Sequence, residues 1–143
     1  MWTTEHTEQT DVAPTAIWAA LRDLHEGVVE APGGDRFEIH GPFAVGTEIS
    51  VTPAGQDTFR STIVELEDER RYADETAFGD VTLRFAHTLA PVDGGGTRIT
   101  HELRISGPGA ATVGPELGPQ ISEDFPAAMQ ALIATARSAA DSR

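Results

Sequence analysis

Two histidines stand out among the side chains that could do chemistry. His87 lies in the alternating segment Val81–Leu89, and His101 lies in the alternating segment Thr97–Ser106. In both segments the histidine shares a face with large apolar residues. Antiparallel pairing across a turn at Asp93–Gly96 would place the two imidazoles side by side. Facing imidazoles could bind a ligand oxygen or transfer a proton. They could equally be partly buried sheet residues whose nitrogens are satisfied by hydrogen bonds.

Asp74 and His6 are further candidates, and the pattern leaves their orientation open. Asp74 alternates with Tyr72 in a segment where both faces mix polar and apolar residues, so it faces either the core or the solvent. An inward carboxylate beside the histidines would be an acid/base partner. His6 belongs to a Thr-rich segment that alternates only loosely. We therefore treat His87, His101 and Asp74 as the candidate catalytic residues.

Several chemistries are excluded by residue types that the sequence lacks. There is no cysteine, lysine or asparagine. This excludes disulfides, thiolate nucleophiles, Schiff bases and N-glycosylation. His101 and Glu102 begin like the zinc motif H-E-x-x-H, but its fifth position is Ile105 and the segment is a predicted strand. No G-x-S-x-G elbow occurs, so serine hydrolase chemistry has no support. We expect neither a metal nor another cofactor.

The charge and hydropathy of the chain restrict its partners. The formal net charge is −13 with histidine neutral, which repels phosphate backbones and anionic membranes, so we expect no nucleic acid partner. The longest wholly apolar run, Ala16–Leu21, is far below the ~20 residues that span a bilayer, so we expect no membrane insertion. The first residues lack the basic and apolar regions of a signal peptide. We expect a cytoplasmic protein, and a lysine- and asparagine-free composition is typical of GC-rich genomes, which favours a bacterial source.

Strands dominate the first three quarters of the chain. The 143 residues fit one domain. Gly and Pro separate short segments of period two, which predict consecutive antiparallel hairpins. The predicted strands are Trp2–Thr10, short strands around Phe37–Ile39 and Ile49–Val51, and longer ones at Thr58–Leu66, Arg70–Phe78, Val81–Leu89 and Thr97–Ser106.

Helical periodicity is found after the first strand and at the end of the chain. A stripe from Ile17 to Leu24 predicts a helix that begins near Pro14 and stops near Gly27. The segment Val28–Asp35 is expected to be a loop or a broken short helix. The spacing of apolar residues after the last strand predicts a helix over Glu116–Ala139, in which Pro126 kinks the helix or starts its second half. The fold class is therefore α+β, with a curved six- or seven-stranded antiparallel sheet around a long C-terminal helix.

The order of these elements and several motifs resemble the SRPBCC superfamily, the START-like or Bet v 1-like helix-grip proteins that include polyketide cyclase/dehydrase-like members. The resemblance covers nearly the whole chain as a single domain, residues 1–143. The matching segments are A-P-T-A-I-W-A-A-L (Ala13–Leu21), G-P-F-A-V-G-T (Gly41–Thr47), G-G-G-T-R-I-T-H (Gly94–His101), S-G-P-G-A and G-P-E-L-G-P within Ser106–Pro119, and F-P-A-A-M-Q-A-L (Phe125–Leu132).

The resemblance implies a deep cavity between the sheet and the long helix, with the Gly/Pro-rich link Gly107–Gly118 at its mouth. The implied function is the binding of a hydrophobic small molecule that is lipid-like, aromatic or polyketide-like. One alternative is a cyclase/dehydratase-type enzyme that uses His87 and His101 as acid and base, and another is a protein-interaction module. The expected ligand-binding residues are His6, Phe59, Ile63, Phe85, His87, His101, Leu103, Leu117, Ile121 and Phe125.

Overall fold

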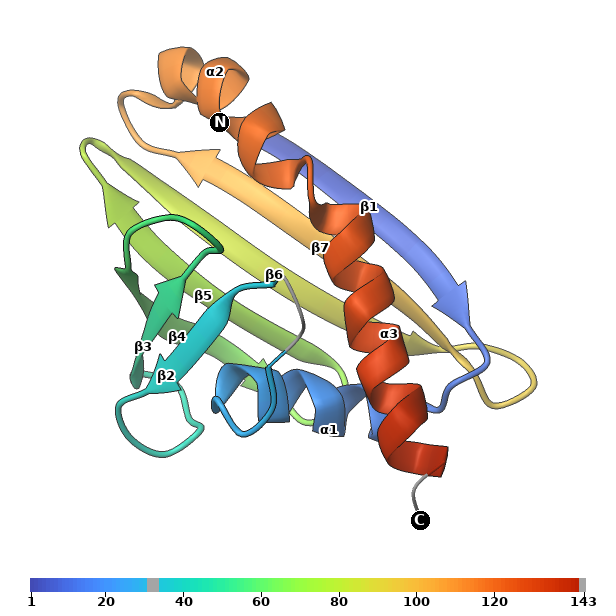
Figure 1. The fold of residues 1–143 in the computed structure, drawn as a ribbon. Helices are drawn as coiled ribbons and strands as arrows, with labels where there is room; N and C mark the ends of the chain where they lie inside the picture. Colours follow the sequence, from blue (N-terminus) through green and yellow to red (C-terminus); the bar gives the residue numbers. More distant parts are fainter. Residues whose placement is uncertain (31–33, 142–143) are drawn as a thin grey trace.

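A curved antiparallel sheet with helices on one face makes up the protein (Figure 1). The computed structural model describes residues 1–30 and 34–141. The strands are β1 (Trp2–Thr10), β2 (Arg36–Ile39), β3 (Glu48–Thr52), β4 (Phe59–Glu67), β5 (Arg71–Phe78), β6 (Val81–Pro91) and β7 (Thr97–Ser106). The helices are α1 (Pro14–His25), α2 (Ala110–Ser122) and α3 (Phe125–Asp141). The α+β helix-grip prediction is confirmed.

The strands follow one another as hairpins, and the first strand closes the far edge. The order across the sheet is β1-β7-β6-β5-β4-β3-β2, and every neighbouring pair is antiparallel. Trp2 pairs with Ile105, so β1 lies beside the last strand rather than beside β2. The register shifts between Ile63 and Glu65 of β4, which marks a β-bulge. Such an irregularity bends a strand and increases its twist.

Helix α1 follows the pattern read from its apolar stripe. Pro14 occupies the first turn, where its missing N–H is not needed. Ile17 and Leu21 are buried against the sheet. After the helix ends, Gly27 has φ +76°, and a Cβ there would lie 2.6 Å from the carbonyl oxygen of Phe37. Only glycine fits this left-handed, crowded position.

The structure has two helices, α2 and α3, where the sequence predicts one helix over Glu116–Ala139, and together they begin earlier and end later. The Gly/Pro-rich stretch after β7 is not a loop as far as Gly118, because α2 already begins at Ala110. Pro115 and Pro119 lie four residues apart on an exposed side of α2, where solvent can reach the carbonyl groups that they leave unbonded. The break falls immediately before α3, and Pro126 occupies the first turn of that helix. The prediction that Pro126 starts a second half is therefore right.

The inner face of the sheet is covered unevenly by the helices. At one end, α1 and α3 pack on the sheet in a sealed core that contains Ile17, Ile63, Tyr72, Leu89, Ile99, Met129 and Leu132. At the other end, a smaller cluster contains Val81, Leu83, Leu103, Ile105, Ala110 and Phe125, and the partly buried residues Trp2, Phe85, Val113 and Ile121 pack against it. Partly buried residues such as Phe43 and Leu66 also border the first cluster, but they are a smaller share of its apolar residues. By this measure the α2 end is the more open of the two.

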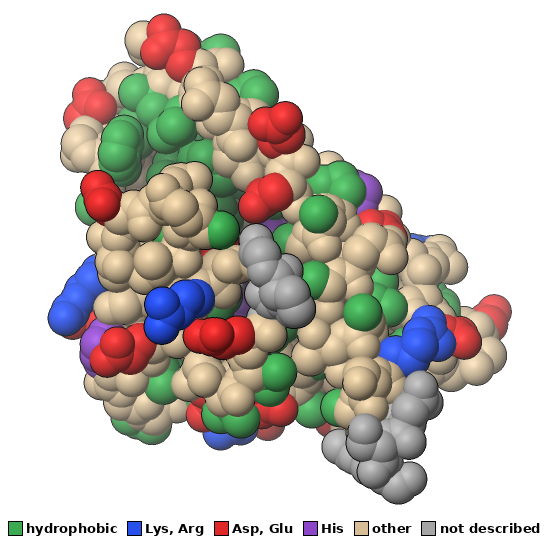
Figure 2. Space-filling view, viewed as in Figure 1, with side chains coloured by type: hydrophobic (Ala, Val, Ile, Leu, Met, Phe, Trp, Pro, Cys, Tyr) green, Lys and Arg blue, Asp and Glu red, His purple; other side chains and the backbone are tan. Residues whose placement is uncertain are grey.

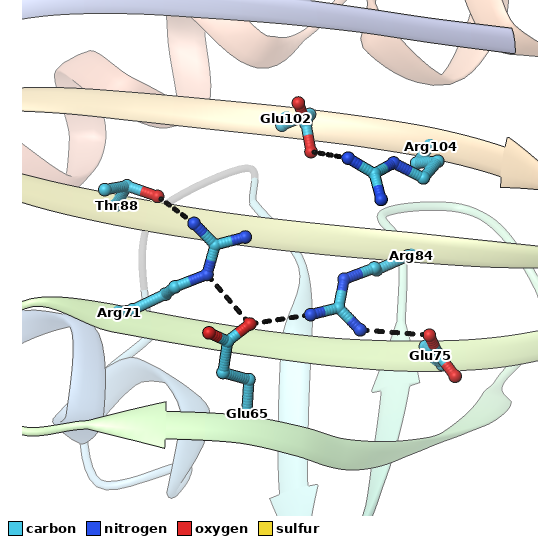
Figure 3. Close-up of polar contacts among 7 residues, drawn as sticks. All are labelled: Glu65, Arg71, Glu75, Arg84, Thr88, Glu102 and Arg104. Atoms are coloured by element: carbon cyan, nitrogen blue, oxygen red, sulfur yellow. Dashed lines mark hydrogen bonds and ion pairs between the residues drawn. The ribbon is translucent and has the colours of Figure 1, made fainter.

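The outer face of the sheet carries a network of charges (Figure 3). Glu65 Oε1 forms an ion pair with Arg71 Nε at 2.8 Å and accepts a hydrogen bond from Arg84 Nη2 at 2.7 Å. Arg84 Nη1 also donates to Glu75 Oε2 at 3.1 Å. Glu102 pairs with Arg104 on β7 at 3.6 Å. These arginines are thus paired with carboxylates of the same strand or of neighbouring strands. No helix within the described residues is long and apolar enough to cross a membrane.

Candidate functional site

Four polar ring side chains form a row across the inner face of the sheet. His6 of β1 pairs with His101 of β7, which pairs with His87 of β6, which pairs with Tyr72 of β5. Directly paired residues of antiparallel strands point to the same face. The sequence pattern predicted the neighbouring positions of His87 and His101. It did not predict that the row extends to Tyr72.

The rings of Tyr72, His87 and His101 in this row are tilted or stacked against their neighbours. His87 and His101 are stacked, with centroids 4.1 Å apart. His101 stacks in turn on Phe125 of α3, at 4.0 Å with an interplanar angle of 14°. His25, from the last turn of α1, has its centroid 4.3 Å from that of Tyr72. The imidazoles therefore fill the same kind of space as aromatic rings in a core.

Burial keeps these imidazoles neutral. It lowers the pKa of His25 to about 4 and that of His101 to about 3. It also lowers the pKa of His87 well below its usual value, with the neighbouring charge of His101 acting in the same direction. His25 Nδ1 donates a hydrogen bond to the carbonyl oxygen of Leu21 at 2.7 Å, which leaves Nε2 as an acceptor. At neutral pH these side chains are hydrogen-bonding rings, not cations.

His6 lies at the sheet edge and is held by its own strand. Its Nε2 is 2.6 Å from Oε2 of Glu8, and the other carboxylate oxygen of Glu8 accepts from Gln130 of α3. His6 is half-buried on the inner face. The open question about its direction is therefore answered by its pairing with His101.

Asp74 faces inward, next to the row of rings. It pairs with Phe85 on the inner face and is 5% exposed. Tyr72 donates its hydroxyl to Asp74 Oδ2 at 2.7 Å. Burial raises the pKa of Asp74 to about 6, although the neighbouring hydroxyl groups of Tyr72 and Ser61 oppose this shift. Burial also raises the pKa of Tyr72, with the nearby charge of Asp74 adding to the shift.

Two hydroxyl residues that the sequence did not single out complete a polar patch beside Asp74. Ser61 of β4 is buried and donates to the backbone carbonyl of Glu75 at 3.0 Å. Thr76 of β5 is 7% exposed, and its Oγ1 has no hydrogen-bond partner among the described residues. A buried hydroxyl without a partner is energetically costly, so such groups commonly mark functional positions. The clue in the sequence was the run of polar residues at every second position after Tyr72.

The remaining predicted ligand-binding residues divide into buried ones and ones that keep some exposure. Ile63 and Leu103 are fully buried, and Phe125 is nearly so. Those that keep some exposure are Phe59 of β4, Phe85 of β6, and Leu117 and Ile121 of α2. The exposed set surrounds the α2 end of the inner face. In the view of Figure 2, apolar side chains gather in a hollow there, between α2 and the end of the sheet that carries β2 and β3.

Helix α2 is docked on the first strand through two glycines. Trp2 of β1 lies against Gly114 and Gly118, which are one turn apart on α2. A Cβ at either position would overlap the Trp2 side chain. The glycines thus let the helix approach the indole, and this contact positions Leu117 and Ile121 over the open end.

A separate shallow groove lies between α1 and α3. It has a volume of about 420 Å³ and is lined mainly by small residues such as Ala16, Ala20 and Ala136. It contains none of the candidate side chains. The polar patch and the row of rings therefore belong to the inner face of the sheet and not to this groove.

A curved sheet that grips a C-terminal helix over an apolar inner face with a few polar groups defines a Bet v 1-like, SRPBCC protein. More narrowly, the chain belongs to the family described as polyketide cyclase / dehydrase and lipid transport, whose model matches residues 1–137. This is a fold that binds hydrophobic ligands. No curated protein sequence matches the chain significantly.

Solved structures share the fold at low sequence identity. Norcoclaurine synthase from Thalictrum flavum, in complex with dopamine and hydroxybenzaldehyde, has a TM-score of 0.72 at 15% identity, covering 99% of this chain and 87% of that one. Ara h 8.0201 has a TM-score of 0.73 at 19% identity, covering 95% and 97%. Protein NE0264 from Nitrosomonas europaea has a TM-score of 0.70 at 17% identity, covering 98% and 97%. These likenesses concern the fold, and function has to be argued from the site.

Proposed function

We propose that this protein binds an apolar small molecule, lipid-like, aromatic or polyketide-like, between the inner face of β5–β7 and the helices α2 and α3. The observation that carries the proposal is the uneven sealing of the inner face. Phe85 and Ile121 remain half-exposed beside Leu103, which is fully buried. Ligand sites are commonly concave apolar surfaces with a few polar groups that orient the ligand.

A neutral fluorescent probe tests this proposal. N-phenyl-1-naphthylamine should increase in fluorescence when added to the protein. Phe85→Glu places a charge on the inner face and should abolish the increase. Thr82→Glu adds the same charge to the outer face of the same strand and should leave it intact. Loss of binding in both variants, or in neither, would contradict the proposed location. Circular dichroism establishes that both variants fold.

Native mass spectrometry provides a second test that needs no variant. Protein purified from its own host should retain a small molecule whose mass adds to that of the chain. The retained molecule should be displaced by an excess of the fluorescent probe. A retained molecule that the probe cannot displace would place the ligand elsewhere.

Asp74 supports a second candidate function, which is proton transfer to or from a bound ketone or alcohol, as in cyclisation or dehydration. Its pKa of about 6 is close to neutrality, whereas those of the histidines are far below it. A group with a pKa near the working pH is the most effective acid or base. Asp74, oriented by Tyr72, is therefore the better candidate for acid/base chemistry than the predicted His87 and His101.

Hydrogen exchange measures this chemistry directly. In deuterated water, the protein should accelerate loss of the α-proton signals of 2-tetralone, a cyclic aromatic ketone, followed by NMR. Asp74→Asn should remove the acceleration. Glu75→Gln, the same change one residue along the strand and on the outer face, should preserve it. If the probe binds but exchange is not accelerated, the protein is a binder and not this kind of catalyst.

A further inference from the structure

Within the part of the chain that the structure describes, the inner face of the sheet carries no lysine or arginine to receive an acidic ligand. The sequence contains no lysine. On the three central strands, Arg71, Arg84 and Arg104 all lie on the outer face. The other described arginines are exposed, and they are Arg22, Arg36, Arg60, Arg70, Arg98 and Arg137. No arginine within the described residues reaches the site.

Acids and neutral rings take the place of cations at this site. Asp74 is buried in the polar patch, and His87 and His101 are packed as rings. Asp35, before β2, and Asp124, at the break between α2 and α3, are near enough for their charges to interact. Burial raises the pKa of both, and the charge of Asp124 adds to the shift at Asp35. A carboxylate ligand would meet negative charge with no compensating base.

The polar patch offers a specific pair of hydrogen bonds. Asp74 Oδ2 is occupied by the Tyr72 hydroxyl, so its other oxygen is the acceptor that remains. Thr76 Oγ1, two residues along the same face of β5, has no partner in the described part of the chain. A ligand hydroxyl could donate to the first and accept from the second. A ligand carboxylate cannot donate, and it would face Asp74.

We propose that the site selects its ligand by charge, accepting uncharged aromatic molecules that carry a hydroxyl group and excluding the corresponding carboxylates, with Asp74 and Thr76 as the selecting residues. This inference rests on the proposed binding function. Phe85, which pairs with Asp74 across the strands and is only half-buried, gives an aromatic ligand a ring to pack against beside this pair. The pair on β5 orients its polar end.

Three naphthalene compounds of nearly equal size test the proposal. Each is used to displace N-phenyl-1-naphthylamine at neutral pH. We expect 2-naphthol to bind at least about tenfold more tightly than 2-naphthoate, because an uncompensated like charge in a buried site costs at least this factor. We also expect 2-naphthol to bind more tightly than naphthalene, which has no hydroxyl group. Equal or tighter binding of 2-naphthoate would overturn the charge selection, and equal binding of naphthalene would overturn the hydroxyl anchor.

Variants assign the effect to the selecting residues. Asp74→Asn should reduce the preference for 2-naphthol over 2-naphthoate, whereas Glu75→Gln on the outer face should not. Thr76→Val is nearly isosteric and removes an unpartnered hydroxyl, so it should fold well and lose the preference for 2-naphthol over naphthalene. Unchanged preferences in both Asp74→Asn and Thr76→Val would overturn the assignment. If the fluorescent probe itself fails to bind the unaltered protein, the proposed function fails, which is distinguishable from a failure of selection.

Discussion

The two faces of the central strands accommodate polar side chains differently. On the outer face, Arg84 bridges Glu65 and Glu75, and water screens what the pairs leave uncompensated. On the inner face of the same strand, three residues along, His87 is kept neutral by burial. Side chains of one strand therefore have different chemistry because only one face reaches solvent. Charges on the outer face are paired, whereas the inner face holds neutral rings beside Asp74, whose carboxyl accepts the Tyr72 hydroxyl.

Truncation of adjacent residues on β7 should show the largest difference between the faces. Leu103 is fully buried on the inner face, so Leu103→Ala should lower the free energy of unfolding by ~2–5 kcal/mol. Glu102→Ala, on the outer face, should cost less than ~1 kcal/mol because its ion pair is partly solvated. Urea unfolding of both variants measures the two values. Similar costs would mean that the faces are not distinguished by burial.

Acid should destabilise the protein through the inner-face histidines. The folded pKa values of His25 and His101 lie below the 6.5 of the unfolded chain, so protons bind preferentially to the unfolded state as the pH falls. Asp74, whose pKa is raised from 3.8 to about 6, binds its proton preferentially in the folded state and so opposes this loss between about pH 6 and pH 4. We expect a net loss of roughly 3 kcal/mol in unfolding free energy between pH 6.5 and pH 4.

Replacing one ring by another distinguishes this cause from general acid denaturation. His101→Phe retains a ring for stacking on Phe125, so it should fold and show a smaller loss with falling pH. His40→Gln alters a histidine at the surface, where it is bonded to Ser50, and should keep the original pH profile. Urea titrations at several pH values provide the measurement. Parallel profiles for all three proteins would exclude His101 as a cause.

Substitutions on the two sides of α2, one packed on Trp2 and one facing solvent, should differ less in their effect on the free energy of unfolding. Gly118→Ala places a methyl group against Trp2 and should cost ~1–3 kcal/mol, the usual range for overpacking. It should also change the fluorescence of Trp2 as the helix moves. Gln120→Ala, on the exposed side of α2, should be neutral in both measurements. An unchanged Trp2 signal in Gly118→Ala would mean that the contact does not hold the helix in solution.

Among these features, the ion pairs of the outer face should contribute the least to the free energy of unfolding. Glu65→Gln removes the carboxylate shared by Arg71 and Arg84, yet we expect a loss below ~1 kcal/mol that decreases further in high salt. The salt dependence of urea unfolding for the unaltered protein and this variant gives the comparison. A larger, salt-independent loss would indicate that the network is effectively buried.

Alternation predicted the faces of β6 and β7 well because each strand has one clearly apolar side. His87 and His101 could be paired from sequence because a short hairpin sets the register between their strands. Asp74 could not be oriented, since Tyr72 and Ala73 place a buried residue on each face of β5. The direction of the Asp74 side chain is set by the pairing of β5 with both neighbouring strands.

Other features depended on structure that local patterns do not encode. Ser61 lies beside Asp74 because of pairing near a bulge in β4, and His25 reaches Tyr72 only through the packing of α1. Gly and Pro disfavour helix interiors, and the predicted helix accordingly begins only at Glu116. The segment from Ala110 is nonetheless helical, and Gly114 and Gly118 let it pack closely on Trp2. Tertiary packing outweighed propensity there.

The pairing of Trp2 with Ile105 affects the order in which the chain can fold. Among the described strands, β1 is synthesised first and β7, with which it pairs, is synthesised last. The hairpins from β2 to β7 can form as each strand is synthesised, whereas β1 remains unpaired until β7 has been made. Contacts between residues so distant in sequence slow folding, because the intervening chain must be closed into a large loop. Glu5 and Glu8 place negative charge along β1 while it is unpaired, and charged side chains discourage strand pairing with other chains.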